Sequence, residues 1–203
     1  MTTNLIDLRQ AREAAPDNLP SLQAYLAQLV GEPFRFARVS YGDELTLHFG
    51  DLRPARSPKL KARSYGAYIL GVRTSSWILK AGTVPLVLSA GIDPENVPSG
   101  FGQPVRNEEI ETTEFIQPGS RVLFASAFVV KPANGFGLHL GFSDGSAIHI
   151  LPAPSDAEGS EDEALPELAD WELIAPSGLL SAGPGSIWAF KPRPDAAPDP
   201  AGM

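Results

Sequence analysis

The sequence predicts a mainly β (α+β) fold, a pseudo-twofold duplicated β-sandwich or barrel preceded by one or two N-terminal helices. Gly and Pro together make up 39 of the 203 residues, 19 Gly plus 20 Pro, and this excess favours many turns and short strands over long helices. From about residue 34 onward, apolar and polar residues alternate with the period that is typical of strands. A strand pattern that recurs later in the chain indicates two similar halves.

Two helices are expected before the strands. Residues 4–15 form a candidate helix that Asn4 would open and Pro16 would stop. Residues 20–30 are the stronger candidate, because Pro20 suits a first turn, Gly31 suits the C-terminal end, and the apolar residues follow the spacing of one helical face. These apolar residues are Leu22, Tyr25, Leu26, Leu29 and Val30.

Strand-like segments follow in order along the chain. Residues 91–118, rich in Gly, Pro and acidic residues, are interpreted as a connection with one short element at most. An acidic loop at 154–170 separates the last strands from the others. The predicted strands are 34–41, 43–49, 65–72, 75–81, 85–90, 120–131, the two arms of 134–152, 171–176 and 186–192.

The hairpin segment 134–152 has a counterpart near the start of the chain. GDELTLHFGD (42–51) aligns with GFGLHLGFSD (135–144), so that the pattern L-x-L-x-F recurs at an offset of 93 residues. Trp77 and Trp171 each begin a W-x-L strand, at an offset of 94 residues. Each half alone has too few strands to bury both faces of a sheet, so we expect the halves to share one core.

The domain organisation follows from this repeat. We predict a single domain over residues 1–192, with halves at about 32–92 and 119–192 after the N-terminal helices. A chain of this length can bury a sizeable core. The Pro-rich tail 193–203 is predicted to be disordered.

The pattern of the hairpin also selects its turn. A two-residue loop, Asp144-Gly145, would pair apolar with polar residues on both faces. A three-residue loop that begins at Ser143 gathers the apolar residues on one face, and burial should enforce that register, with Gly145 as the left-handed residue that such loops need. This register predicts three cross-strand pairs: Leu140 with Ile148, Leu138 with Ile150, and His139 with His149.

The pair of His139 and His149 is the first candidate site. Cross-strand Cβ atoms lie about 4.5–5.5 Å apart, so that two imidazoles could share a metal ion. A catalytic zinc site needs a third ligand, which would be a carboxylate or His48 because the chain has no cysteine. Two half-exposed histidines on a solvated hairpin face are the alternative interpretation.

Two charged loops form the second candidate site. Residues 53–63 hold five of the chain's 16 basic residues, and residues 154–170 carry seven acidic ones, the last of them Asp170. Such loops could dock a protein partner through electrostatic guidance. They could also face each other within the fold or across a homodimer, or be solvated without a partner. The partner-binding candidates are Arg53, Arg56, Lys59, Lys61 and Arg63.

The layout YGDELTLHFG (41–50), followed by a W-x-L strand and repeated as L-x-L-x-F-S-D-G and W-E-L, resembles uncharacterised bacterial families of small cytoplasmic β-proteins. The resemblance covers about half of the chain. Some similar modules are suspected immunity or accessory proteins, and this implies a function in protein interaction. The resemblance implies no catalytic residues, and the basic loop and the long central connection depart from it.

Composition argues against several classes of function. A net charge of −8 disfavours nucleic acid as a partner, and the lack of cysteine excludes disulfides and thiolate sites. The first residues lack the apolar stretch of a signal peptide. The longest apolar run, 122–130, is far short of the roughly 20 residues that span a bilayer as a helix. Neither G-x-S-x-G nor a Walker-type GK[ST] motif is present, so a hydrolase is the least favoured class.

The sequence therefore predicts a cytoplasmic, bacterial, non-enzymatic protein-interaction module of adaptor or inhibitor (immunity) type. It would use the charged loops to bind an unknown protein partner, without nucleic acid, membrane or cofactor. The alternative is a small-ligand or metal-binding β-barrel that uses the face of His139 and His149.

Overall fold

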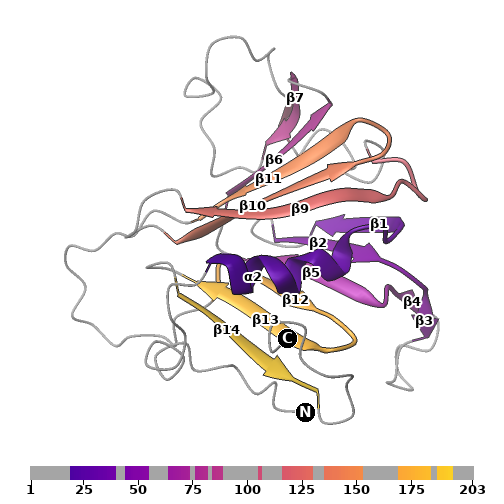
Figure 1. Cartoon of the computed structure of the whole chain (residues 1–203). Coiled ribbons are helices and arrows are strands. Elements are labelled where there is room, and N and C mark those ends of the chain that lie inside the picture. The colour runs from indigo at the N-terminus through magenta and orange to yellow at the C-terminus, as the bar shows by residue number, and fades with distance from the viewer. Residues whose placement is uncertain are drawn as a thin grey trace.

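The fold of the chain is described by a computed structural model (Figure 1). The described residues are 19–39, 44–54, 64–73, 76–81, 84–88, 105–106, 116–129, 135–152, 169–183 and 187–193, and for 84–88 and 105–106 this description covers the backbone alone.

A single short helix precedes the strands in the described part of the chain. Helix α2 spans Leu19–Leu26 and continues as the 3-10 turn η1 over Ala27–Leu29. Its apolar face buries Leu22, Tyr25, Leu26 and Leu29, as the spacing predicts. Val30, predicted on the same face, is exposed, because the helical segment ends at Leu29 and Val30 is extended. Gly31 follows with a φ of 90° that favours glycine. The helix predicted at 20–30 is thereby confirmed, whereas the one predicted at 4–15 lies outside the described residues.

The strands form two six-stranded sheets and one short ribbon. In the first sheet the order is β1-β2-β5-β12-β13-β14, and in the second it is β8-β7-β6-β11-β10-β9. Neighbours are antiparallel except β7 and β8. The first sheet contains β1 (Phe34–Val39), β2 (Leu45–Phe49), β5 (Tyr68–Val72), β12 (Trp171–Ile174), β13 (Gly178–Gly183) and β14 (Ile187–Pro192). The second contains β6 (Ser76–Ala81), β7 (Val84–Leu88), β8 (Val105–Arg106), β9 (Val122–Val129), β10 (Phe136–Phe142) and β11 (Ser146–Leu151), and the ribbon pairs β3 (Arg53–Pro54) with β4 (Ser64–Tyr65).

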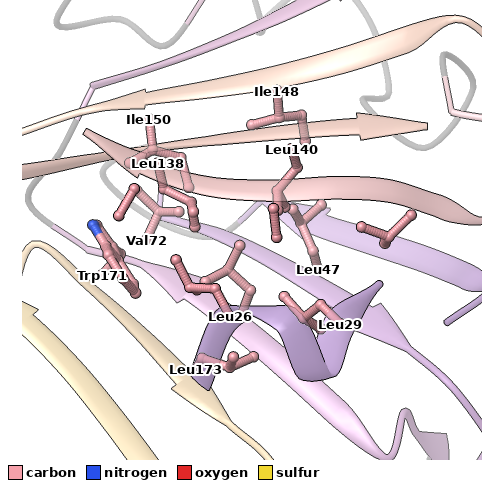
Figure 2. Packing of buried hydrophobic residues seen from close by; sticks show 14 of the residues in the cluster. Leu26, Leu29, Leu47, Val72, Leu138, Leu140, Ile148, Ile150, Trp171 and Leu173 are labelled. Carbon is pink, nitrogen blue, oxygen red and sulfur yellow. The ribbon is translucent and has the colours of Figure 1, made fainter. Parts of the chain in front are cut away.

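The core lies between the two sheets. Figure 1 shows one sheet above the other, with α2 lying across the opening between β9 and the first sheet. Leu26 and Leu29 point from this helical segment into the space between the sheets, where Leu47 and Leu138 meet them from opposite sides (Figure 2). The alternation of the strands and the single helical face therefore bury one common apolar cluster.

One buried hydrogen bond joins the two sheets across this core. The indole N–H of Trp171, on β12 of the first sheet, donates to the carbonyl oxygen of Phe136, on β10 of the second, at 2.7 Å. Because a buried indole N–H without an acceptor is costly, this bond makes Trp171 a link between the sheets as well as an apolar core residue.

The two halves of the chain have similar strand orders, except that β7 and β8 are parallel whereas their counterparts β13 and β14 are antiparallel. Each half places three strands in one sheet and three in the other, so that the halves exchange strands. The order of the first sheet becomes that of the second, read from β9 to β8, when equivalent strands of the two halves are exchanged. The equivalent pairs are β1 and β9, β2 and β10, β5 and β11, β6 and β12, β7 and β13, and β8 and β14. Residues aligned by the sequence pattern occupy equivalent places: Trp77 pairs with Ile150, and Trp171 pairs with Val72.

The halves meet at an isolated bridge between Pro33 and Arg121. On one side of it Phe34 N–H donates to the Ser120 carbonyl at 2.7 Å, and on the other Val122 N–H donates to the Glu32 carbonyl at 3.0 Å. The two bonds correspond to each other across an offset of 88 residues. Phe34 of the first half corresponds to Val122 of the second, and Glu32 corresponds to Ser120. The segments beginning at 31 and 119 thus form a match that the sequence pattern did not predict.

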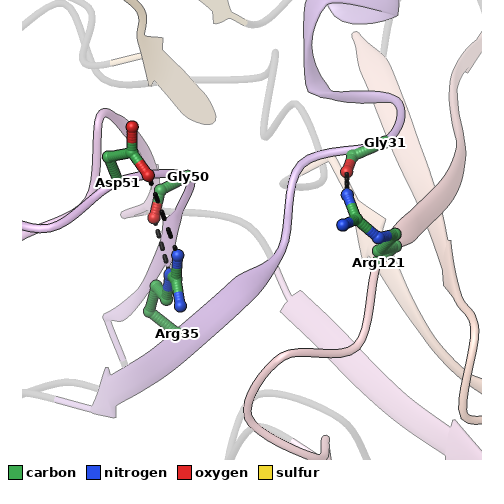
Figure 3. Close-up of polar contacts among 5 residues, drawn as sticks. All are labelled: Gly31, Arg35, Gly50, Asp51 and Arg121. Atoms are coloured by element: carbon green, nitrogen blue, oxygen red, sulfur yellow. Dashed lines mark hydrogen bonds and ion pairs between the residues drawn. The ribbon is translucent and has the colours of Figure 1, made fainter.

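Each half also carries a β-bulge one residue after this joint, at Arg35 in β1 and at Leu123 in β9. Figure 3 shows how two arginines hold this region. The Arg121 side chain donates to the Gly31 carbonyl at 2.7 Å, and Arg35 Nε donates to the Gly50 carbonyl at 2.7 Å. Charged side chains therefore satisfy backbone carbonyls shortly before β1 and directly after β2.

The sandwich, of the two predicted architectures, is confirmed, and the barrel is wrong. Among the described residues both sheets remain open, and a cluster of apolar side chains packs between them. The sequence also missed β13, because GLLSAG lacks a clear alternation. Gly178 is needed there, since a Cβ at this position would lie 2.3 Å from the Lys191 carbonyl oxygen of β14. None of the described helices has the length and apolar character needed to cross a bilayer.

Candidate functional site

The hairpin of β10 and β11 has the register that its alternation predicts. Leu138 pairs with Ile150, Leu140 with Ile148, and His139 with His149. The loop is the predicted three-residue one, and Gly145 has a φ of 87°. All three cross-strand pairs are therefore confirmed, with the apolar pairs facing the core.

Asp144 holds the turn of this hairpin in place. Its carboxylate accepts hydrogen bonds from Ser146 N–H at 2.9 Å, Ser146 Oγ at 2.6 Å and Gln117 N–H at 2.8 Å. Burial alone would raise the pKa of Asp144, but the hydrogen bonds from Ser146 and Gln117 outweigh it and keep that pKa below its ordinary value. The histidine pair thus lies on a hairpin whose turn is held by hydrogen bonds to Asp144.

The two imidazoles stack on the outer side of the second sheet. The ring centroids of His139 and His149 are 3.8 Å apart and the ring planes are inclined by 25°. On the other side of His139, the ring of Phe124 stands edge-on at 4.7 Å. Both histidines are half-buried, so the pair is packed against its neighbours.

Both imidazoles are neutral near pH 7. Burial, then the proximity of His139, then the charge of Lys80 lower the pKa of His149 to about 4. Burial and then Lys80 also lower the pKa of His139. Lys80 lies on β6, next to β11, and burial lowers its pKa as well. The site therefore disfavours any further positive charge.

Two glycines let aromatic rings lie close to the strands beside this pair. A Cβ on Gly141 would be 2.2 Å from the ring of Phe124, and a Cβ on Gly137 would be 2.4 Å from the ring of Phe128. Both rings belong to β9 and cover β10 from outside. Phe124, Phe128, His139, His149 and Lys80 together form what we name the histidine face.

Among the described residues, no third metal ligand accompanies the histidine pair. Within the ranges that the structure describes, no cluster of three or more His, Asp or Glu residues could hold a metal ion. His48, the third ligand considered from the sequence, lies on β2 of the other sheet. The lone pair of an imidazole nitrogen lies in the plane of the ring. In two nearly parallel, stacked rings the lone pairs therefore do not converge on one shared metal ion.

His48 instead belongs to an aromatic cluster on the outer side of the first sheet. Its ring stacks on Phe36 at 4.2 Å and lies 5.7 Å from the ring of Tyr65, and its exposed fraction is 1%. The backbone N–H of Gly66 donates to His48 Nδ1 at 3.2 Å. Burial, and then the charge of Arg38, lower the pKa of His48 to about 4.

Arg38 completes this cluster. Its guanidinium carbon lies 4.9 Å from the ring centroid of Phe36 and 5.8 Å from that of Tyr65, distances typical of cation–π contacts. We name the four residues Phe36, Arg38, His48 and Tyr65 the Arg38 cluster. Phe36 and Arg38 are two residues apart on β1, so the sequence places them on the same face of that strand. The cluster was nevertheless not predicted, because it also needs Tyr65 from a separate ribbon.

The basic loop begins and ends beside the Arg38 cluster. The ribbon of β3 and β4 forms its two ends, with Arg53 directly opposite Tyr65. Arg53 is exposed. The other four partner-binding candidates, Arg56, Lys59, Lys61 and Arg63, lie outside the described residues, so the structure places only the base of this loop.

The acidic loop is described only at its end. Asp170 is fully buried, and its backbone carbonyl accepts a hydrogen bond from Arg73 N–H at 3.2 Å. Counting Asp170 among exposed loop charges was therefore wrong, because it lies against the core immediately before Trp171. The other acidic residues of this loop are outside the described ranges.

Comparisons with known proteins add no identity to this geometry. No protein-family model matches the chain, and no curated protein and no solved structure matches it significantly.

Proposed function

We propose that this chain is a non-enzymatic protein-interaction module, of adaptor or inhibitor (immunity) type, that acts in the bacterial cytoplasm. Its basic loop, residues 53–63, binds an acidic surface of a protein partner. Five of these eleven residues are basic and none is acidic, in a chain whose net charge is −8. This local reversal of sign would attract a negatively charged partner and steer it to one place.

The observation that carries the proposal is the anchoring of this loop at both ends. The β3–β4 ribbon ties Arg53 to Tyr65, the ring of Tyr65 contacts His48, and Gly66 N–H bonds the same imidazole. A charged loop held at its base loses less conformational freedom on binding than a free one. The two ends of the loop, Arg53 and the ribbon strand that contains Tyr65, are therefore held beside the Arg38 cluster.

Affinity capture of the tagged full chain from a lysate of its host, at low and at moderate salt, tests this function. We expect a stoichiometric protein partner that moderate salt releases, because exposed charge pairs are screened. The variant Arg56→Glu/Lys59→Glu should lose the partner without a lower melting temperature.

The matched control is Lys191→Glu/Arg193→Glu, which reverses one lysine and one arginine at the far end of the chain, on and just after β14. It should retain the partner. Equal capture by both double variants, or the absence of a partner at either salt, would contradict the proposed function.

A further inference from the structure

The guanidinium of Arg38 rests on an aromatic platform and stays exposed to solvent. The rings of Phe36 and Tyr65 lie within cation–π distance of it, and Phe36 is itself supported by the stacked ring of His48. An arginine that stacks on aromatic rings has its planar fork oriented before any ligand arrives. Its N–H groups can then bind an anion with little further loss of side-chain freedom.

The charge of Arg38 has no carboxylate partner within the described part of the chain. The two ion pairs found there join Arg35 to Asp51 at 3.9 Å and Arg73 to Glu172 at 3.3 Å. His48, beneath the platform, is neutral near pH 7 and adds no second charge. Arg38 thus faces solvent as a positive group supported from below.

Arg53 extends this positive region toward the basic loop. It lies directly opposite Tyr65 in the β3–β4 ribbon, and residues directly opposite each other in an antiparallel pair project from the same face. Two arginines therefore flank Tyr65, one from the first sheet and one from the ribbon.

We propose that Arg38, with Arg53 and Tyr65, forms an oxyanion-binding site that receives a carboxylate or phosphate group of the protein partner. Arginine suits both groups, because its parallel N–H donors can bind two oxygens at once, and the phenol of Tyr65 can supply another donor. The inference rests on the proposed function and gives it a defined point of contact. The loop would supply attraction over a distance, and Arg38 would supply recognition of the group itself.

Two peptide probes test this site with the full chain. One is fluorescein-labelled decaglutamate, and the other is a labelled peptide with one phosphoserine among neutral residues. We expect Arg38→Lys, which keeps the charge but loses the fork and the stacking, to weaken binding of at least one probe about tenfold, as the loss of a charge-assisted hydrogen bond does. A loss with decaglutamate alone assigns a carboxylate, and a loss with the phosphopeptide alone assigns a phosphate.

Arg193→Lys is the matched control, since it makes the same exchange at a residue just after β14, and it should bind both probes like the wild type. Wild-type affinity of Arg38→Lys for both probes, or no binding of either probe by the wild type, would overturn the site. Arg56→Glu/Lys59→Glu separates the two proposals. If this double variant binds the probes normally while Arg38→Lys binds them weakly, the oxyanion site is supported and the loop proposal fails. If Arg38→Lys binds the probes normally while the double variant binds them weakly, the loop proposal is supported and the oxyanion site fails.

Discussion

The imidazole rings of His139 and His149 stack across β10 and β11 with their centroids 3.8 Å apart, within reach of the charge of Lys80. Both rings are half-buried on the same face of the sheet, and burial there favours their neutral state. Protonation of either ring would place a new positive charge beside its neighbour and beside Lys80. The stability of the hairpin is therefore coupled to pH.

We expect the free energy of unfolding to fall as the pH drops from about 6.5 toward 4. The pKa of His149 is lowered from 6.5 to about 4 in the folded protein, so the unfolded state binds more protons between these values. The loss from this group stays below about 1.4 kcal/mol per pH unit, and is smaller here because the half-buried ring is partly screened by water.

Urea unfolding of the wild type and of His149→Gln across this pH range measures the effect. The variant should lose less stability on acidification, because glutamine does not titrate. Titration of the histidine Cε1–H signals by NMR should give a low pKa for the same ring. Parallel pH curves for the two proteins would show that His149 is not responsible.

Zinc binding by the histidine pair remains a prediction of the sequence. At least one ring must turn before both nitrogens can face one ion, because the planes are inclined by only 25°, and the stacking contact with the other ring is then lost. The measurement is the zinc content after mild purification in a zinc-containing buffer. His139→Ala and His149→Ala should each release the metal, and a metal-free wild type would contradict the prediction.

Gly141→Ala should destabilise the protein by about 1–3 kcal/mol, the usual cost of inserting a methyl group into a packed position. The new Cβ would lie 2.2 Å from the ring of Phe124. In a Phe124→Ala background the same change should be close to neutral, and the double-mutant cycle should show a coupling energy of about 0.5–3 kcal/mol.

The matched control for this cycle is Gly71→Ala. Gly71 lies on β5 of the other sheet, and a Cβ there would meet no atom within 4 Å. It should leave stability unchanged or raise it slightly, because alanine has less freedom to lose than glycine. Equal losses of stability for Gly141→Ala and Gly71→Ala would mean that the contact with the ring of Phe124 is not the cause.

Gln23→Met should destabilise the protein and promote self-association. The side-chain amide of Gln23 donates to the Ala125 carbonyl and accepts from Ala127 N–H at 3.1 Å. It therefore covers part of the outer edge of β9, which ends the second sheet. Methionine has a similar length but no such bonds, so we expect a loss of about 1–3 kcal/mol and an edge open to pairing.

Urea unfolding and sedimentation velocity together test this edge. Gln28→Met serves as the control, because Gln28 bonds Tyr25 and Ser177 and does not bond β9. Its sedimentation should match the wild type even if its stability falls. An unchanged sedimentation profile for Gln23→Met would contradict the role of Gln23 as an edge cover.

The sequence by itself determined the buried face and the register of one hairpin, that of β10 and β11. Alternation decides which side chains are buried, and a slip of one residue would have exposed Leu138 and Leu140. The stacked pair of His139 and His149 follows directly from that register. Likewise the L-x-L-x-F and W-x-L patterns identified the equivalent strands of the two halves, since equivalent core positions need similar apolar residues.

Only the tertiary structure decided which strands are neighbours. Alternation does not specify a partner strand, and here β6 pairs with β11 and β12 with β5, so that each half completes the sheet of the other. The sheet assignment also places His48, on β2, and His139, on β10, in different sheets. The Arg38 cluster could not be predicted either, because Tyr65 reaches Arg38 only when the ribbon folds against the outer face of the first sheet.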